Sequence, residues 1–324
     1  MRAALCQTFG GIENLVIADL PDPLPGSGEV LVGIHYAALN FFDLLIIAGK
    51  YQVKPQLPFS PAGEFSGRVL AIGADVTGFA PGDLVCGYSG YGAAREKICV
   101  KADALSHLPA SISDEAAAGL SITYGTTMHA LKQRAQLSPG ESLAILGASG
   151  GVGLAAIELG RLMGAKIIAC ASSQDKLDFA KKAGAEVLID YSREDWREAL
   201  KAASQGRGID VIYDAVGGPY TETALRSIGW KGRLLVVGFA AGDIPKIPLN
   251  LALLKGCAIV GVFWGEFIKR EPEVQRQNMQ QLLSWAAEGK LSTHVHAIYP
   301  LADIGKAMGE LSSRRAQGKV LIKL

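Results

Sequence analysis

Residues 142–164 read SLAILGASGGVGLAAIELGRLMG, and this stretch decides the fold. An apolar run typical of a buried strand comes first, and a run with apolar residues at helical spacing ends the segment. Between them lies a turn of small residues, 147–153. Such residues let the backbone turn sharply and approach a pyrophosphate, whose charge the free N–H groups at the helix start would meet. A glycine-rich turn between a strand and a helix is therefore a specific signal for dinucleotide binding.

The chain around this turn repeats the same pattern of a strand followed by a helix. Near-continuously apolar strands that alternate with amphipathic helices predict a parallel sheet covered on both faces. The handedness of the crossovers then favours a doubly wound, Rossmann-type fold. The strands are expected in SLAILGA, KIIACAS, EVLID, DVIYDAV, RLLVVGF and AIVGVFW, which span 142–148, 166–172, 186–190, 210–216, 233–239 and 258–264.

The flanking parts of the chain have a different pattern. Residues 1–120 carry short β-rich runs with frequent Gly and Pro, which predicts an irregular antiparallel domain. After residue 266 follow a helix at 274–289 and strand-like runs at 293–301 and 319–324. We expect residues 266–324 to return and complete the first domain, and residues 121–265 to form the Rossmann domain.

Composition restricts the classes of partner. The formal net charge is +1 over 324 residues, with no basic block, so the sequence argues against nucleic acid and for a small-molecule partner. No apolar run is long enough and free enough of Gly and charge to predict a membrane span. Five widely spaced cysteines argue against a disulfide framework and for a reducing cytoplasm.

The end of the second Rossmann strand indicates which dinucleotide is bound. NAD-binding versions usually place an acidic residue there, but this chain has Ser172 and Ser173 followed by Lys176. A carboxylate would repel the extra phosphate of NADP, whereas hydroxyls and a lysine would hold it. Each charge-assisted contact contributes on the order of 1.5–3 kcal/mol. We therefore expect NADPH, although Lys176 is also compatible with an ordinary solvated helix position.

Several motifs together resemble one known family. LNFFDLLIIAGKY, PFSPAGEFSGRV, PGDLVCGY, GASGGVGLAAIELG, DVIYDAVGG and GVFWG occur in this order. They resemble the zinc-free quinone oxidoreductase (zeta-crystallin-like) family of the medium-chain dehydrogenase/reductase superfamily. The resemblance covers essentially the whole chain. It implies an α/β protein with a GroES-like catalytic domain, a Rossmann domain, and a homodimer joined through strand 257–264.

The same comparison implies that no zinc is bound. Zinc-dependent relatives have a Cys near the position of Asn40 and Gly-His-Glu where this chain has Ala62, Gly63 and Glu64. Catalytic zinc needs three protein ligands, which Glu64 alone does not supply. We therefore expect no metal site.

The resemblance also assigns cofactor-binding residues. Ser172, Lys176 and Tyr191 match the family's pocket for the 2′-phosphate, and Arg314 matches its distal arginine. The other positions would contact the pyrophosphate, the nicotinamide and the crevice wall. They are Asn40, Thr127, Ser149, Gly150, Gly151, Val152, Gly217, Gly238, Phe239, Phe263 and Trp264. For Phe263 and Trp264, packing at a dimer interface is an equally good interpretation.

Without zinc, catalysis must rely on positioning a substrate over the nicotinamide and on a donor for the developing oxyanion. Asn40 and Tyr51 are the candidate catalytic residues, through an amide and a phenol. Asn40 is also compatible with pinning a loop, and Tyr51 with forming a hydrophobic wall. Leu45 stands where some members have an aromatic residue, which favours an aliphatic substrate.

Two activities fit these residues: reduction of quinones, and reduction of α,β-unsaturated carbonyls as in related enoyl reductases. A third interpretation is a structural or RNA-binding protein that retains NADPH affinity. The near-neutral charge and the lack of a basic stripe count against RNA.

Overall fold

The computed structural model describes residues 1–324, which divide into two compact units. Unit 1 comprises residues 1–122 and 279–324, and unit 2 comprises residues 123–278. Helix α3 (Leu120–Met128) spans the first boundary and α10 (Pro272–Ala287) spans the second. The first half of α10 belongs to unit 2, where Asn278 is hydrogen-bonded to Gln133. The return to unit 1 therefore comes at residue 279 rather than at the expected residue 266.

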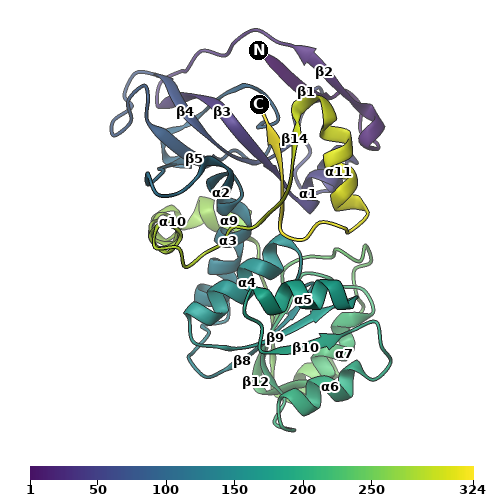
Figure 1. The fold of residues 1–324 in the computed structure, drawn as a ribbon. Coiled ribbons are helices and arrows are strands. Elements are labelled where there is room, and N and C mark those ends of the chain that lie inside the picture. Colours follow the sequence, from purple (N-terminus) through teal and green to yellow (C-terminus); the bar gives the residue numbers. More distant parts are fainter. The chain divides into compact units, whose positions relative to one another are not determined.

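Unit 1 is built on a seven-stranded sheet in the order β14-β15-β3-β4-β5-β7, with β6 paired to β3 and a separate β1-β2 hairpin (Figure 1). Most pairs are antiparallel, and β14 runs parallel to β15. The last strand thus pairs with β3, and both chain ends lie in this unit (Figure 1). The strands are β1 (Arg2–Cys6), β2 (Leu15–Asp19), β3 (Glu29–Leu39), β4 (Glu64–Ile72), β5 (Leu84–Tyr88), β6 (Lys97–Lys101), β7 (Leu105–His107), β14 (Val295–Pro300) and β15 (Lys319–Lys323). The helices are α1 (Phe41–Ile47), α2 (Asp114–Ala118) and α11 (Ile304–Ser312), with short 3-10 helices at Ile12–Asn14, Ala102–Ala104 and Leu301–Asp303.

Unit 2 is a doubly wound parallel sheet in the order β10-β9-β8-β11-β12-β13, as the sequence predicted. The order reverses between β8 and β11, which is where such folds bind ligands. Its strands are β8 (Ser142–Leu146), β9 (Lys166–Ala171), β10 (Val187–Asp190), β11 (Ile209–Asp214), β12 (Ile228–Val236) and β13 (Ala258–Gly261). Its helices are α4 (Gly151–Leu162), α5 (Gln174–Lys182), α6 (Trp196–Ala203), α7 (Tyr220–Arg226), α8 (Asn250–Lys255) and α9 (Trp264–Arg270), with a π-helical segment at His129–Arg134.

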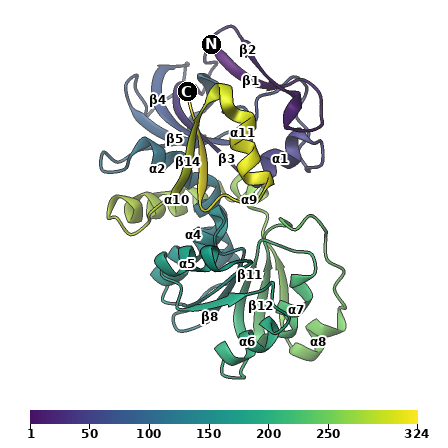
Figure 2. The ribbon, with the colours of Figure 1, turned by 45° about the vertical axis from the view of Figure 1, so that its right-hand side comes forward.

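The reversal of strand order places helices on both faces of this sheet. Helices α4 and α5 lead to β9 and β10, toward one edge of the sheet, whereas α6, α7 and α8 lead to β11, β12 and β13, toward the other edge. Right-handed crossovers therefore put these two groups of helices on opposite faces of the sheet (Figure 2). The core contains Leu146, Ile168, Ile212 and Leu234 from the strands. The edge strand β13 is shorter than the expected 258–264, since the chain leaves it after Gly261 and begins α9 at Trp264.

The glycine turn depends on close backbone packing. A Cβ placed on Gly153 would lie 2.2 Å from the carbonyl oxygen of Gly147 and 2.7 Å from the Cα of Ala148. Helix α4 can therefore begin directly above the turn only because residue 153 has no side chain.

We predict that Gly153→Ala lowers the free energy of unfolding by about 1–3 kcal/mol, because the methyl group overpacks the turn. The matched control is Gly309→Ala in helix α11, where an added Cβ meets nothing within 4 Å. That change should be neutral or stabilise by about 0.5–1 kcal/mol. Urea unfolding of both variants measures the difference, and equal stability of the two would contradict the packing argument.

Candidate functional site

The glycine turn presents unpaired donors at the carboxyl end of β8. Gly147 adopts φ +76° and the N–H of Gly150 donates to its carbonyl at 3.1 Å, which closes the turn. The first internal hydrogen bond of α4 runs from Leu154 N to Gly150 O. The N–H groups of Gly151, Val152 and Gly153 precede it, as in the first turn of any helix, and can point at an anion. These residues fit a pyrophosphate.

The loops that follow β11 and β12 lie against each other. Asp214 is buried at the end of β11, and its carboxylate accepts the N–H of Val216 and of Gly217 at 2.9 Å each and the hydroxyl of Thr221 at 2.5 Å. A Cβ on Gly217 would lie 2.8 Å from the Phe239 ring. A Cβ on Gly147 would also lie 3.0 Å from the Val216 side chain. The predicted crevice residues Gly217 and Phe239 are thus brought together, and the Gly217 loop borders the glycine turn.

The candidates for the 2′-phosphate lie at the end of β9. The ammonium of Lys176 donates to the hydroxyl of Ser172 at 3.3 Å; Ser172 is exposed and Lys176 is partly exposed. Tyr191 joins the same region, because its backbone N–H donates to Ala171 O at 3.0 Å. The structure therefore brings Ser172, Lys176 and Tyr191 to one strand end with no carboxylate at the end of β9.

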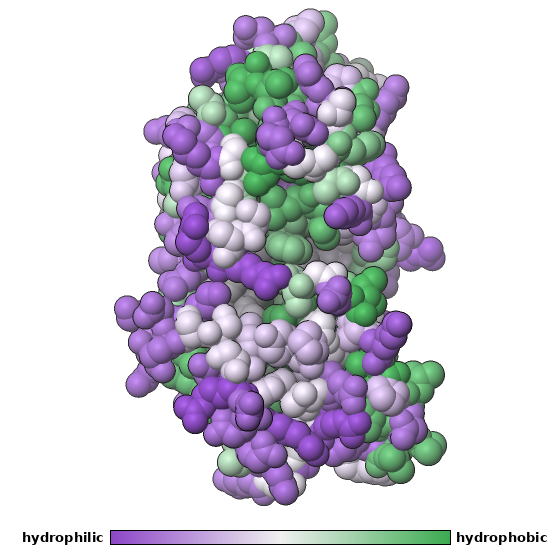
Figure 3. Space-filling model, turned by 90° about the vertical axis from the view of Figure 1, so that its right-hand side faces the viewer, coloured by the Kyte–Doolittle hydropathy of each residue, from purple (hydrophilic) through white to green (hydrophobic).

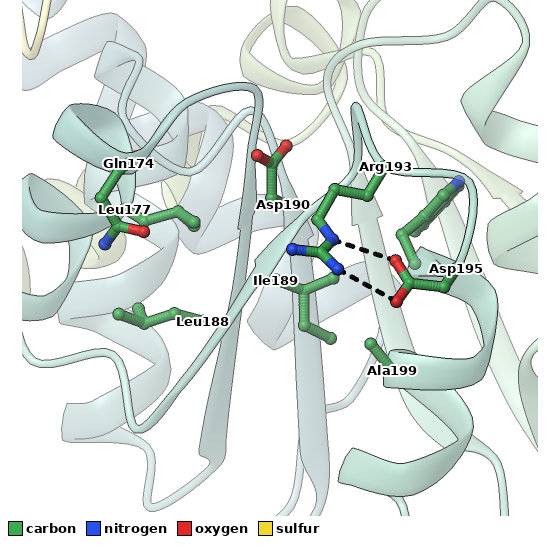
Figure 4. Close-up of a pocket in the computed structure, with 9 residues that line it drawn as sticks. Gln174, Leu177, Leu188, Ile189, Asp190, Arg193, Asp195 and Ala199 are labelled. Atoms are coloured by element: carbon green, nitrogen blue, oxygen red, sulfur yellow. Dashed lines mark hydrogen bonds and ion pairs between the residues drawn. The ribbon is translucent and has the colours of Figure 1, made fainter.

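An open cavity of about 410 Å³ lies beside this region, between α5, β10 and α6 (Figure 4). Asp190 at the end of β10 turns its carboxylate back onto Ser192, whose backbone N–H donates to it at 2.9 Å. Arg193 is paired at 3.1 Å with Asp195, two residues further along the chain, at the edge of the cavity (Figure 4). These acidic groups are thus engaged with neighbours along the chain.

Three further predicted cofactor residues of unit 2 have different environments. Thr127 on α3 is fully buried, and its hydroxyl lies 2.9 Å from the Tyr213 hydroxyl and 3.4 Å from the carbonyl oxygen of Val152 on α4. Trp264 is buried, and its indole N–H donates to Gln275 at 3.1 Å. Phe263 beside it is 53% exposed. Trp264 thus packs inside the chain rather than at an exposed interface, whereas the exposed Phe263 side chain is free to meet another molecule.

In unit 1, a buried charge cluster surrounds Asn40. The ammonium of Lys319 on β15 is 3% exposed and donates to Leu39 O at 3.1 Å, to Asn40 Oδ1 at 2.7 Å and to Glu64 Oε1 at 2.7 Å. Glu64 is fully buried, and its other oxygen accepts the N–H of Ile122 at 2.7 Å. Lys319, Glu64 and Asn40 thus form one hydrogen-bonded unit, in which every donor of the ammonium has an acceptor.

The amide of Asn40 is already engaged in this cluster. Its Nδ2 donates to Glu64 Oε1 at 2.9 Å, with Ala38 O at 3.5 Å on the other side. Contact between this amide and a substrate oxyanion would require one of these donors to be released. The geometry therefore favours the loop-pinning interpretation of Asn40 over direct donation.

Asp43 fixes the backbone around Asn40, at the start of α1. Its buried carboxylate accepts the N–H of Asn40 at 2.7 Å and of Ala62 at 3.1 Å. Burial raises the pKa of Asp43 to about 7, although the two backbone hydrogen bonds and the Lys319 charge lower it. Ala62 adopts φ +64°, a conformation that costs energy for a non-glycine residue, and the Asp43 hydrogen bond helps to hold it there.

Tyr51 lies beside this loop, partly buried, with its ring stacked on Phe42 at a centroid distance of 5.5 Å. Burial, followed by the charge of Asp43, raises the pKa of the Tyr51 phenol above its usual value. The phenol therefore keeps its proton at neutral pH and is able to donate it in a hydrogen bond.

The residues present do not fit a zinc ion. No group of three or more His, Cys, Asp or Glu side chains is placed to hold a metal. Both carboxylate oxygens of Glu64 are occupied, one by Lys319 and one by a backbone N–H. A cation is thus already present beside Glu64, and it is an ammonium.

Sequence reasoning missed the role of Lys319, whereas the expectation that Asp43 orders its loop through backbone hydrogen bonds is confirmed. A lysine at the start of the otherwise apolar terminal strand is a signal for a buried charge. Arg314 belongs to unit 1, where it adopts φ +56°, and its proposed contact with the cofactor stays a prediction.

The comparisons with known proteins agree with this fold. Residues 26–110 match the alcohol dehydrogenase GroES-like domain family, and residues 151–288 match the zinc-binding dehydrogenase family. The chain is 38% identical to the quinone oxidoreductase-like protein 2 homolog of Nematostella vectensis, over 99% of this chain and 88% of that protein. It is 31% identical to a quinone oxidoreductase of Pseudomonas aeruginosa, over 97% of both chains.

A solved structure leads to the same family. The quinone oxidoreductase of Escherichia coli complexed with NADPH superposes with a TM-score of 0.93 at 30% identity, covering all of both chains. The fold and the site define a medium-chain dehydrogenase/reductase. The chain belongs to the quinone oxidoreductase family, which is a family of oxidoreductase enzymes. None of its helices is both long enough and apolar enough to span a membrane.

We predict that Lys319→Met destabilises the protein by about 3–5 kcal/mol, because it leaves the Glu64 carboxylate buried without its counterion. Adding Glu64→Gln to that variant should recover part of the loss, with a coupling energy of about 0.5–3 kcal/mol in the double-mutant cycle. Lys323→Met, at an exposed position of the same strand, is the control and should change stability by less than about 0.5 kcal/mol. Additive effects of the two buried substitutions in urea unfolding would contradict the ion-pair description.

Proposed function

We propose that this chain is an NADPH-dependent, zinc-independent reductase of quinones. The observation that carries the proposal is the pairing of Lys176 with Ser172 at the end of β9, where NAD-specific folds usually place a carboxylate. Relatives named quinone oxidoreductase, and one solved with NADPH, support it.

Residues of unit 2 would hold the dinucleotide. The N–H groups of Gly151 and Val152 meet the pyrophosphate, and Ser172, Lys176 and Tyr191 meet the 2′-phosphate. The loops at Gly217 and Gly238–Phe239 form the crevice wall. When bound, NADPH supplies the hydride for the reduction.

Residues of unit 1 would serve the substrate. Tyr51 is protonated at neutral pH, so its hydroxyl donates a hydrogen bond to the carbonyl oxygen on which charge develops. Asn40 acts as a positioning residue, because Lys319 and Glu64 fix its amide. The Asp43 carboxylate keeps the backbone of this loop in place.

A second activity, reduction of α,β-unsaturated carbonyls, is favoured by one residue. Leu45 on α1 offers an aliphatic surface rather than an aromatic ring for stacking a quinone. A panel of quinones and enones distinguishes the two activities, when each compound is tested for NADPH oxidation with NADH in parallel. Turnover of quinones supports the proposal, turnover of enones alone supports the second activity, and preference for NADH contradicts the cofactor assignment.

We predict that Lys176→Ala lowers kcat/KM for NADPH by about 10–100-fold and leaves kcat/KM for NADH unchanged, because only NADPH carries the 2′-phosphate. Lys181→Ala, at an exposed position of the same helix, should leave both values unchanged. Steady-state kinetics of the two variants test this. A parallel loss for NADPH and NADH would assign Lys176 to the fold rather than to the phosphate.

We further propose that the protein is a homodimer joined at the open edge of β13. This strand pairs only with β12, so its other edge is free to add a strand. Apolar side chains are exposed on and near α8, with Leu249 76%, Leu253 79% and Leu254 69% exposed. Figure 3 shows apolar surface at the lower right of the molecule, the side on which α8 lies in Figure 2. A second copy would cover this surface by the same patch, as in a two-fold dimer.

We predict that Ile259→Lys on β13 converts the dimer to a monomer, because it places a charge in the interface. Leu24→Lys, at an 86% exposed position of unit 1, is the control and should remain dimeric. Sedimentation velocity measures the masses. A monomeric wild-type protein, or a dimer that survives Ile259→Lys, would rule out this interface.

A further inference from the structure

Unit 2 has a second, basic pocket far from the glycine turn. Its volume is about 220 Å³, and it is lined by α6, the loop 206–208, the end of α7, the start of β12 and the end of α8. Five of its nine lining residues are basic and none is acidic: Arg197, Lys201, Arg207, Arg226 and Lys255. In a chain whose formal net charge is only +1, this is a marked concentration of positive charge.

Most of these cations lack a counterion. Arg226 is paired with Glu222, at 2.6 Å. The side chains of Arg197, Lys201, Arg207 and Lys255 have no hydrogen bond or ion pair with any other residue of the chain. Like charges gathered around one hollow repel one another, and an anion in the hollow would relieve this repulsion.

The pocket lies at the opposite end of the sheet from the dinucleotide site. Its residues directly precede β11 and include the first residue of β12, whereas the glycine turn follows the carboxyl end of β8. β11 has six residues, so the two ends of the sheet are separated by roughly 20 Å. Helices α6, α7 and α8 lie together at the lower end of the unit in Figure 2. The basic pocket is therefore separate from the phosphate contacts of the cofactor.

The size of the pocket limits its ligand. A volume of 220 Å³ corresponds to about seven water molecules, and it is below the range of about 300–1,000 Å³ that holds drug-sized ligands. Arginine and lysine together suit phosphate oxygens, since the guanidinium binds two oxygens at once and the ammonium binds as a point charge. We propose that this pocket binds the phosphate or diphosphate group of a small metabolite, as a second anion site independent of NADPH.

The test is calorimetric titration of the full chain, saturated with NADPH, with inorganic pyrophosphate at about 0.15 M salt. The variant Lys201→Gln/Arg207→Gln removes two unpaired, exposed cations, so it should fold normally. The control variant Lys181→Gln/Lys182→Gln removes the same charge from exposed positions of α5. We expect the wild-type protein to bind pyrophosphate with a Kd below about 1 mM. This Kd should rise by about tenfold or more in Lys201→Gln/Arg207→Gln and stay unchanged in the control variant.

Each remaining outcome overturns the proposal. Absence of binding to the wild-type protein would mean that the pocket is only a solvated basic surface. Equal weakening in both variants would mean a diffuse charge effect, and no weakening in either would place the anion elsewhere. Tighter binding of a short RNA than of pyrophosphate, lost in Lys201→Gln/Arg207→Gln, would assign the pocket to nucleic acid. A second titration without NADPH distinguishes the basic pocket from the cofactor site, because bound NADPH blocks pyrophosphate only at the cofactor site.

Discussion

The buried ammonium of Lys319 is the interaction on which the geometry of unit 1 depends. It joins three segments that are far apart in the chain: the terminal strand β15, the loop that begins α1, and the first residue of β4. A charge buried in this way is tolerated only if it is paired and if its remaining donors are satisfied. Lys319 meets both conditions, since a carboxylate, a side-chain amide and a backbone carbonyl accept its three donors. The position of the Asn40 side chain depends on this ion pair.

In the zinc-independent activity proposed above, the Lys319 ammonium takes the place that a metal ion has in zinc-dependent relatives. In both cases a carboxylate needs a cation beside it in a water-poor environment. A metal would also polarise the substrate directly, as a Lewis acid. An ammonium whose donors are all engaged does not, so we propose that a neutral donor polarises the substrate. Tyr51 is the candidate, because its raised pKa keeps the phenol protonated at neutral pH. In this proposal, the Lys319 ammonium positions the start of α1 and the Tyr51 phenol contacts the substrate.

The sequence predicted much of unit 2, because the information there is local. The glycine turn, each apolar strand and the Ser172–Lys176 pair are each made of residues close together in the chain, so local patterns reveal them.

The sequence predicted less of unit 1. Lys319 contacts Glu64 across 255 positions, and no local pattern reports a contact at that separation. The contact between Glu64 and Ile122 likewise depends on a backbone N–H group, which the residue types do not show. The basic pocket was missed for the same reason, since its five cations are dispersed from 197 to 255.

The central proposal is that the Lys319 ammonium, rather than a metal ion, organises the start of α1 in this oxidoreductase. The most direct test is to measure the bound zinc and the NADPH-dependent turnover in one sample, before and after dialysis against a chelator. The account predicts far less than one zinc per chain and the same turnover in both samples. Turnover that disappears with the chelator and returns in proportion to added zinc would contradict it.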